Sequence, residues 1–408
     1  MARQGIIIGG GASGLTAAIA AAEQGASVTV LEHMPKMGKK LLSTGNGRCN
    51  LTNTRLEADC YRSDCAGFPM QVLSRFTPKD TMKFFRRLGV VTESVNGYIY
   101  PRSMQARTVL DALLDRCEEL GVTLRTDVQI GKIRKENGRF FISADQGVFD
   151  GDFLILAAGS RAAAHTGSDG SGYELARQFG HRVIEPVPAL VQLRCREKYF
   201  RSVAGVRCEA KVTVFVSGSE AASDTGELQL TEYGISGIPV FQVSRFASRA
   251  LAAGKSVTAE LNFLPELEQA EVFSLLREQK KLLAGRKSAG FLTGIFNQKI
   301  AALLIRQAGI GADQPVKTIS GKQFSALCRL IQAFPAEVES TNSFEQAQVC
   351  AGGVDGSEIC AATMESRKEP GLYLAGELVD VDGICGGYNL QWAWASGFLA
   401  GRSAAGKD

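Results

Sequence analysis

Metal-binding and disulfide patterns are missing from this sequence. None of its ten cysteines forms a Cys-x-x-Cys pair, and its three histidines, His33, His165 and His181, have no metal-ligand spacing. We therefore expect reduced and mostly buried thiols, no metal site and no Ser-His-Asp triad.

Long apolar runs and an excess of one charge are also missing. No apolar run approaches the roughly 18 residues that a membrane-spanning helix needs. The chain enters an apolar strand pattern almost at once, so we expect no signal peptide, no membrane partner and a cytoplasmic location. The net charge is +4 over 408 residues, of which 45% are hydrophobic and 22% charged. This balance predicts an ordinary globular protein of roughly two or three domains and argues against a nucleic-acid partner.

The first 32 residues hold the most informative pattern. An apolar run is followed by Gly9-x-Gly11-x-x-Gly14, an alanine-rich helical pattern, a second apolar run over Ser27–Leu31, and Glu32. The glycines allow a tight turn, close approach of a pyrophosphate and close helix packing. Free N–H groups at the helix start attract phosphates, and the terminal acid can accept hydrogen bonds from a ribose. The pattern predicts a dinucleotide-binding βαβ unit; the alternative is an ordinary βαβ unit with a glycine-rich turn.

A polar, glycine-rich loop follows at Ser43–Asn53. Its backbone donors, together with Lys39, Lys40 and Arg48, suit phosphate and flavin oxygens. An irregular loop of this length usually binds something or is well exposed. A solvated surface loop is therefore the alternative to a ligand cradle.

A strand, an acid, a glycine loop and a helix recur near the C-terminus. The apolar pattern Leu372–Ala375 ends at Gly376 and Glu377, and a Gly386-Gly387 pair opens a helix rich in small residues. The helix N-terminus would face phosphates or a carbonyl, and its dipole would favour negative charge on a reduced flavin. Plain core packing of this helix is the alternative.

The pattern between residues 189 and 339 differs from both ends of the chain. Short alternating segments, typical of antiparallel strands in a small barrel or sandwich, lie near its ends, and helical patterns occupy its middle. We therefore predict an insertion that divides the dinucleotide-binding domain. The predicted bounds are 1–188 and 340–408 for that domain, 189–263 and 312–339 for the β part, and 264–311 for a helical cap.

These motifs resemble those of the BaiN-like (YhiN-like) flavoproteins, also described as the aminoacetone oxidase family of FAD-binding enzymes. The matching runs are GGGASGL at 9–15, KKLLSTGNGRCNLTN at 39–53, TGSDGSGYELARQFGH at 166–181, GISG at 234–237 and AGELVDVDGICGGYNLQWAWASG at 375–397. The resemblance implies an α/β fold: a Rossmann-type FAD-binding domain of the glutathione-reductase superfamily, in its fumarate-reductase-like branch, with an inserted β-barrel and helical cap.

The resemblance also implies FAD as the cofactor and assigns residues to it by motif. The first glycine turn would hold the pyrophosphate, Glu32 the adenosine ribose and Val128 the adenine, while the late acids would face the ribityl chain. The implied cofactor-binding residues are Gly9, Gly11, Ala12, Ser13, Gly14, Glu32, His33, Lys39, Lys40, Asn46, Gly47, Arg48, Cys49, Asn50, Val128, Ala157, Ala158, Gly159, Gly376, Glu377, Asp382, Gly386, Gly387, Tyr388, Asn389 and Leu390.

The implied activity is that of an FAD-dependent oxidoreductase acting on a small organic substrate bound between the flavin and the inserted domain. The reaction would be NAD(P)H-fed reduction or dehydrogenation of an enone or steroid-like molecule, or amine oxidation. No second dinucleotide motif is visible, so NAD(P)H would bind only transiently. No catalytic residue is assigned, since a structural role is as well supported for each of the candidates Arg48, Glu232, Tyr233, Cys385 and Tyr388. A flavin-binding sensor or assembly protein without turnover is the alternative.

Overall fold

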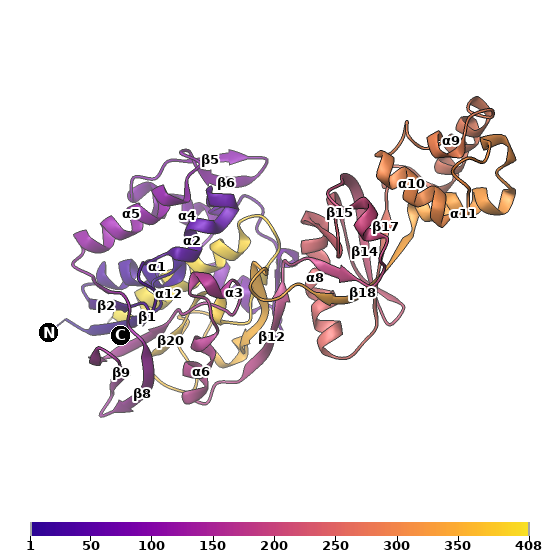
Figure 1. The fold of residues 1–408 in the computed structure, drawn as a ribbon. Coiled ribbons are helices and arrows are strands. Elements are labelled where there is room, and N and C mark those ends of the chain that lie inside the picture. Colours follow the sequence, from indigo (N-terminus) through magenta and orange to yellow (C-terminus); the bar gives the residue numbers. More distant parts are fainter. Residues whose placement is uncertain (1, 407–408) are drawn as a thin grey trace. The chain divides into compact units, whose positions relative to one another are not determined.

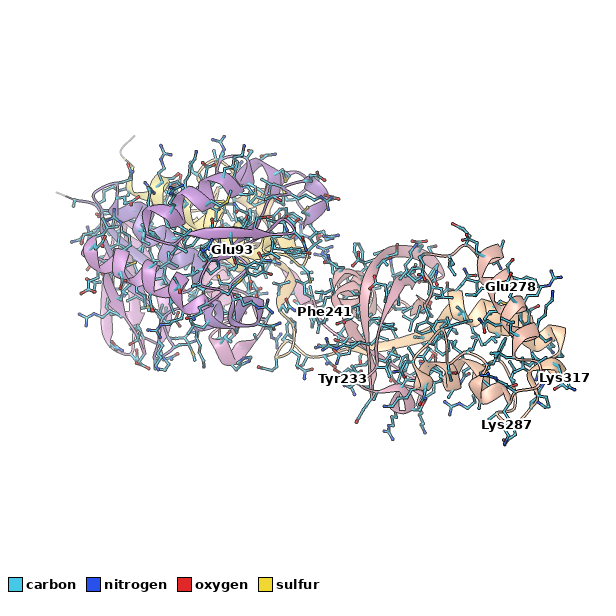
Figure 2. All side chains as sticks on the ribbon, turned by 90° about the horizontal axis from the view of Figure 1, so that it is seen from above. Glu93, Tyr233, Phe241, Glu278, Lys287 and Lys317 are labelled. Atoms are coloured by element: carbon cyan, nitrogen blue, oxygen red, sulfur yellow. The ribbon has the colours of Figure 1, made fainter. Side chains whose placement is uncertain are left out.

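The computed structural model describes residues 2–406 of the chain. The chain divides between Val187 and Pro188, and again between Ala347 and Gln348, into two compact units (Figure 1). Unit 1 contains both ends of the described chain, and unit 2 is the insertion between them; Figure 2 draws the side chains of both. These divisions lie close to the predicted ones at 188 and 339.

A five-stranded parallel sheet forms the centre of unit 1, with the strand order β20-β11-β1-β2-β7. Residue Ile7 of the central strand pairs with Val30 on one side and Ile155 on the other. Because β20 pairs with β11, the two chain segments of unit 1 meet in one sheet. The strands are β1 (Gln4–Ile8), β2 (Ser27–Leu31), β7 (Thr123–Arg125), β11 (Phe153–Leu156) and β20 (Leu372–Leu374).

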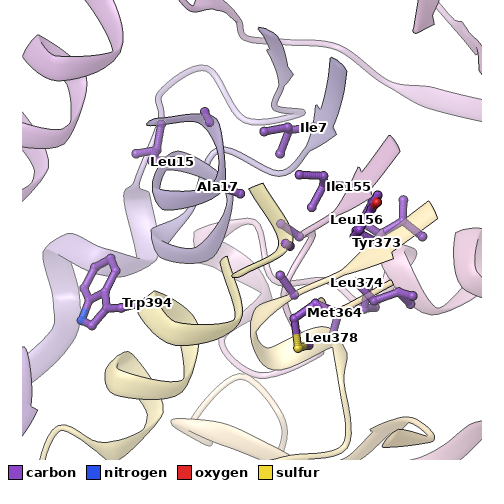
Figure 3. Packing of buried hydrophobic residues seen from close by; sticks show 14 of the residues in the cluster. Ile7, Leu15, Ala17, Ile155, Leu156, Met364, Tyr373, Leu374, Leu378 and Trp394 are labelled. Atoms are coloured by element: carbon purple, nitrogen blue, oxygen red, sulfur yellow. The ribbon is translucent and has the colours of Figure 1, made fainter. Parts of the chain in front are cut away.

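Two helices from opposite ends of the chain, α1 (Ala12–Ala22) and α12 (Tyr388–Ala405), pack against each other beside this sheet. A Cβ added at Gly397 or Gly401 of α12 would lie 2.3 or 2.1 Å from carbonyl oxygens of α1. Glycine is therefore required for the helices to approach this closely. Figure 3 shows part of the buried hydrophobic cluster of unit 1, including Leu15 and Ala17 of α1 and Trp394 of α12.

Smaller elements complete unit 1. The helices are α2 (Lys39–Ser43), α3 (Phe68–Leu73), α4 (Pro78–Arg87), α5 (Ala106–Glu119) and α6 (Ser171–Gln178). An antiparallel meander consists of β8 (Ile130–Glu136), β9 (Arg139–Ala144) and β10 (Gly147–Gly151). The remaining strands form three small sheets: β3 (Thr52–Asn53), β6 (Tyr98–Pro101) and β5 (Thr92–Val95); β21 (Asp382–Gly383) and β4 (Tyr61–Arg62); β12 (Val183–Ala189) and β19 (Val349–Val354).

A closed six-stranded barrel is the main part of unit 2, in the order β13-β16-β15-β14-β17-β18, and β18 pairs back to β13. Its buried hydrophobic cluster shares no residue with that of unit 1. The strands are β13 (Leu193–Cys195), β14 (Arg207–Val216), β15 (Ser219–Thr231), β16 (Gly234–Gly237), β17 (Val257–Asn262) and β18 (Phe334–Thr341), and the helices between them are α7 (Phe200–Val203) and α8 (Ile238–Ala252).

Three further helices of unit 2 are α9 (Gln269–Leu282), α10 (Gln298–Gln307) and α11 (Gly321–Gln332). The predicted cap ends at 311, whereas the structure places α11 within the stretch predicted as barrel and returns to the barrel only at β18. The reason is local, because Ser320 and Gln323 form a reciprocal capping box at the start of α11. This spacing marks a helix start that the prediction did not use.

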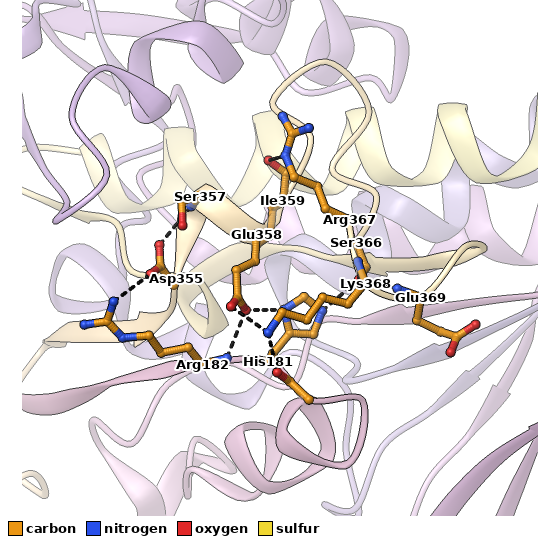
Figure 4. A network of polar contacts seen from close by, with 11 residues as sticks. His181, Arg182, Asp355, Ser357, Glu358, Ile359, Ser366, Arg367, Lys368 and Glu369 are labelled. Carbon is orange, nitrogen blue, oxygen red and sulfur yellow. Dashed lines mark hydrogen bonds and ion pairs between the residues drawn. The ribbon is translucent and has the colours of Figure 1, made fainter.

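A buried polar network joins two distant segments of unit 1. His181 Nδ1 lies 3.0 Å from Glu358 Oε2, and Nε2 lies 2.8 Å from Ser366 Oγ (Figure 4). The sequence predicts no Ser-His-Asp triad, yet this Ser-His-Glu chain has similar connectivity. Ser366 Oγ is buried and accepts the backbone N–H groups of Lys368 and Glu369, each at 3.0 Å. These bonds give the serine a structural role in closing a turn.

Candidate functional site

The turn between β1 and α1 combines very close packing with one open face. A Cβ added at Gly14 would lie 1.9 Å from the Gly9 carbonyl oxygen, and one added at Gly9 would lie 2.3 Å from the Ala157 oxygen. At Gly11, in contrast, an added Cβ meets no atom within 4 Å. The flanking glycines therefore permit close packing of the turn, whereas Gly11 leaves room for a ligand at the helix N-terminus.

Glu32, which follows β2, accepts hydrogen bonds from the backbone at this turn and just after β2. Its Oε2 accepts the Gly10 N–H at 2.7 Å, and its Oε1 accepts the Met34 N–H at 2.9 Å. The carboxylate also lines the adjoining cavity. It can therefore offer remaining lone pairs to ribose hydroxyls while it fixes the backbone around the turn.

A cavity begins at this turn and extends to the N-terminus of α12. Three chain segments that are distant in sequence converge on it because β1, β11 and β20 are neighbours in one sheet. Thirteen of the predicted cofactor residues line it: Gly9, Gly11, Ala12, Ser13, Glu32, Lys39, Lys40, Ala157, Ala158, Gly159, Glu377, Asn389 and Leu390.

Two of the lining residues form an ion pair. Lys40 Nζ lies 2.7 Å from Glu377 Oε2, and the same oxygen accepts the Ser160 hydroxyl at 2.8 Å. The two charged side chains are 25% and 20% exposed, so solvent screens the pair only partly. The contact joins α2 to the chain that follows β20, and thereby links the two segments of unit 1.

A second cavity adjoins the first and is lined by the residues predicted for the adenine side. His33 and Val128 line it, and Gly9 and Glu32 line both cavities. The two cavities are therefore neighbours at the end of β2. The binding of the adenosine half of a dinucleotide at His33 and Val128 stays a prediction.

The residues of the Ser43–Asn53 loop differ in their surroundings: some are exposed, one is buried in the core, and one is hydrogen-bonded to the backbone. Asn46, Gly47 and Arg48 are exposed and line neither cavity. Cys49 is fully buried, and burial raises the pKa of its thiol to about 12. In the amide orientation that satisfies its neighbours, Asn50 accepts the Gly387 N–H at 3.2 Å and donates to backbone carbonyls. Asn50 thus supports the glycine turn before α12, and its side chain is committed to protein atoms.

The other predicted residues near α12 have mainly supporting contacts. The Asn389 side chain exchanges two hydrogen bonds with the backbone of Gly383, at 2.8 and 2.9 Å. Tyr388 is buried, and its ring packs edge-on against Tyr61 with centroids 5.7 Å apart. Burial raises the pKa of the Tyr388 hydroxyl. Asn389 and Leu390 of α12 therefore line the cavity, whereas Gly14, Gly376, Asp382, Gly386, Gly387 and Tyr388 are not among its lining residues.

Eight cavity-lining residues are absent from the predicted set. Thr166, Gly167 and Ser168 belong to the run at 166–181 that carries part of the family resemblance, so a signal was present. Leu41, Thr44 and Ala393 also lie in runs that carry the resemblance, whereas Lys36 and Gly38 lie outside all of them. The eight are Lys36, Gly38, Leu41, Thr44, Thr166, Gly167, Ser168 and Ala393.

The residues present fit FAD. Gly11 provides an open face at the positive end of α1, and the cavity extends from there to the positive end of α12. A dinucleotide with a central diphosphate and a redox ring that gains negative charge matches this arrangement of two helix N-termini. Lys40 and Lys39 add positive charge along the path.

Two of the catalytic candidates, Glu232 and Tyr233, lie in unit 2. The Tyr233 hydroxyl accepts a hydrogen bond from Asn342 at 3.0 Å, and the Arg194 guanidinium lies 4.7 Å from the centre of its ring. The candidate Arg48 is exposed on unit 1. None of the five candidates lines the cavity described above, so their catalytic roles stay predictions.

Comparisons with known proteins identify the family of this chain. A family model described as "HI0933-like protein Rossmann domain" matches residues 3–403. The chain is 46% identical to the 3-dehydro-bile acid delta(4,6)-reductase of Clostridium scindens over 401 residues, or 98% of each chain. It is 31% identical to the ribosomal RNA dihydrouridine synthase of Haemophilus influenzae, also over 98% of each. An open-conformation flavocytochrome c3 fumarate reductase aligns with 99% of this chain and 78% of its own, at 15% identity and a TM-score of 0.47.

No helix within residues 2–406 is both long and apolar enough to cross a bilayer.

The predicted family resemblance is confirmed, and with it FAD as the cofactor. The chain therefore belongs to the HI0933-like family and is an FAD-dependent oxidoreductase with a Rossmann-type fold.

Proposed function

We propose that this enzyme reduces a carbon–carbon double bond conjugated to a carbonyl group in a steroid-like substrate, with NAD(P)H as the electron donor. The observation that carries the proposal is the 46% identity, over 98% of both chains, to a reductase named for 3-dehydro-bile acids. In the overall reaction the β-carbon gains a hydride and the α-carbon a proton, the double bond becomes single, and NAD(P)H becomes NAD(P)⁺.

The cofactor contacts proposed for this chain follow from the cavity. Bound FAD supplies hydride-transfer chemistry. The α1 N-terminus at Gly11 would bind the diphosphate, and Glu32 the adenosine ribose. Lys40, held by Glu377, would add positive charge beside the path. The first turn of α12, at Asn389 and Leu390, would direct backbone N–H groups and a positive dipole end toward the redox ring.

A second candidate is the reduction of uridine in RNA. It is favoured by the 31% identity, over 98% of both chains, to a ribosomal RNA dihydrouridine synthase. The C5=C6 bond of uracil is conjugated to the C4 carbonyl, so both candidates require the same addition to a polarised double bond. The two candidates differ in their substrate, which is a small amphipathic molecule in the first and a polyanion in the second.

An anaerobic titration tests the proposal. The visible spectrum of the FAD-loaded protein is followed as NADH and then NADPH are added. We expect rapid bleaching with one of them, and return of the colour when a 3-oxo-4,6-diene steroid is added, with the saturated product detected by mass spectrometry. Colour return with a uridine-containing RNA alone would favour the second candidate.

Two results would contradict both candidates. A flavin that NADH and NADPH leave yellow, but that an amine bleaches, would indicate amine oxidation. A flavin that is reduced but never reoxidised by any double-bond substrate would favour a sensor or assembly protein without turnover.

A further inference from the structure

The positive charge of this protein is concentrated in one part of unit 2. The segment from Lys280 to Arg329 contains nine Lys and Arg residues and a single acid, Asp313, a net charge of +8. The rest of the chain has 37 basic and 41 acidic residues, a net charge of −4. The small net charge of +4 therefore hides a strong separation, and charge asymmetry of this kind is typical of polyanion binding.

The structure keeps these charges at the surface. Of the nine basic side chains only Lys280 is partly enclosed; it donates to the Ile319 carbonyl at 2.6 Å. The other eight are exposed: Lys281, Arg286, Lys287, Lys299, Arg306, Lys317, Lys322 and Arg329. Within the described residues, the one acid pairs with one of them, Lys287, at 2.7 Å.

Backbone pairing brings the most basic part of the segment together. The Val316 N–H donates to the Arg286 carbonyl at 2.9 Å, and the Lys317 N–H donates to the Ala284 carbonyl at 3.0 Å. Arg286, Lys287 and Lys317 therefore lie on two adjacent stretches of chain. Figure 2 shows Lys287 and Lys317 projecting outward at the same end of the helical part. We call these three residues the basic tip.

A second group of basic residues lies on α10. Lys299 Nζ donates to the Ala204 carbonyl at 3.0 Å, and Arg306 lies 3.5 Å from the Ser202 hydroxyl. Both contacts place α10 beside α7, which adds the exposed Arg201. The basic surface therefore includes side chains from beyond the Lys280–Arg329 segment.

We propose that this basic surface of unit 2, with the basic tip at its centre, binds the phosphate backbone of structured RNA. Arginine and lysine side chains that are exposed and largely unpaired with acids can exchange counterions for phosphates on binding. Unit 1, which contains the cofactor cavity, has 27 basic and 27 acidic residues, whereas unit 2 has 19 basic and 15 acidic residues, so the excess of +4 lies in unit 2. The proposal bears on the second candidate function, but binding is measured independently of any reduction.

The test is RNA binding by fluorescence anisotropy, with a labelled 30-nucleotide RNA hairpin and the FAD-loaded full chain at 50 to 200 mM KCl. The variant Arg286→Glu/Lys287→Glu/Lys317→Glu is compared with Lys79→Glu/Lys83→Glu/Arg86→Glu, which makes the same charge change on the exposed face of α4 in unit 1. We expect the basic-tip variant to bind at least about tenfold more weakly and to lower the salt slope by about 3, roughly one per lost phosphate contact. The α4 control should bind within about twofold of the wild type.

A gain-of-affinity variant protects the test against misfolding. Asp313 is 87% exposed, so Asp313→Lys adds positive charge at the tip with little effect on packing. We expect it to bind the hairpin about threefold more tightly. Three results would each overturn the proposal. They are equal weakening of hairpin binding by both triple variants, no hairpin binding by the wild type at 50 mM KCl, and wild-type binding to phosphatidylserine vesicles without binding to RNA. Binding of the hairpin by the wild type without reduction of its uridines would contradict the second candidate function alone.

Discussion

Gly11 and Gly14 are three residues apart in one turn, yet the structure gives them opposite reasons to be glycine. A Cβ at Gly11 enters open space, whereas a Cβ at Gly14 would lie 1.9 Å from a backbone oxygen. We expect Gly11→Ala to keep the melting temperature of the FAD-free protein and to weaken FAD binding by at least about tenfold, since the methyl group takes space needed by the diphosphate. Isothermal titration with FAD and thermal unfolding without it measure the two effects.

Gly14→Ala is the matched comparison. It should destabilise the FAD-free protein by about 3 kcal/mol or more, because the obstacle is rigid backbone. Unchanged FAD affinity in Gly11→Ala, or a stable Gly14→Ala protein, would contradict this division of roles.

Single residues were predictable from sequence where the local turn decides their role. Gly9, Gly11 and Glu32 are found in the cavity because a strand, a turn and a helix fix their positions together. The pairing of Lys40 with Glu377 spans 337 residues and depends on β20 lying beside β11, so no local pattern could reveal it. Asn50 shows the converse: its loop suggested a ligand contact, whereas its amide is bonded to the protein backbone.

At the scale of helices, α1 and α12 pack closely against each other in unit 1. A Cβ at Gly401 would lie 2.1 Å from the Ala17 carbonyl oxygen. We expect Gly401→Ala to lower the free energy of unfolding of unit 1 by about 2 to 3 kcal/mol, because the helices must separate or bend to admit a methyl group. Arg402→Ala, on the exposed side of the same helix, should change it by less than about 0.5 kcal/mol. Equal urea midpoints for the two variants would refute the close-packing argument.

The network around His181 should make unit 1 sensitive to pH. Burial lowers the pKa of His181, with hydrogen bonding to Glu358 acting in the opposite direction. The unfolded chain takes up a proton at this residue near pH 6.5, whereas the folded chain does so only at lower pH. The stability contribution is therefore complete above about pH 6.5 and is lost as the pH falls below that value.

Urea unfolding between pH 5 and 8 checks this prediction. His181→Gln should be less stable than the wild type at pH 8, because it cannot satisfy both Glu358 and Ser366 as well as the imidazole does. It should also lose stability less steeply below pH 6.5. His165→Gln, at an exposed position, should keep the wild-type dependence of the free energy of unfolding on pH. The same dependence in His181→Gln as in the wild type would contradict the role of His181 in the pH sensitivity.

Whole elements were predictable in proportion to how local their signals are. The strands around the glycine turns were recognised because they are short apolar runs with clear ends, and β1 and β11 are largely buried as expected. The end of the helical part was not recognised, because the residues before Phe334 were assigned to the barrel and the capping box at Ser320 was overlooked. A capping box is a pattern of two residues, and it is easily missed among alternating apolar residues.

At the scale of the whole molecule, average composition concealed the most useful feature of the charge. The chain's +4 is the sum of +8 on one helical segment and −4 elsewhere. The net charge alone therefore argues against RNA binding, whereas the distribution of charge along the chain favours RNA binding. The distribution could have been read from the sequence, but its meaning depends on the fold, which leaves eight of the nine basic side chains exposed.

The two separate hydrophobic clusters predict two separate unfolding events. One cluster lies wholly in unit 1, the other wholly in unit 2, and every cavity residue assigned to FAD lies in unit 1. Calorimetry of the FAD-free protein should therefore show two transitions. Added FAD should raise only one of them, by about 2.7 kcal/mol of stability when its concentration is 100 times the Kd. Leu304→Ala, in the core of unit 2, should lower only the other transition, by about 2 to 5 kcal/mol. A single transition that FAD and Leu304→Ala shift together would mean that the units unfold as one, so that the barrel and its helices transmit their stability to the cofactor site.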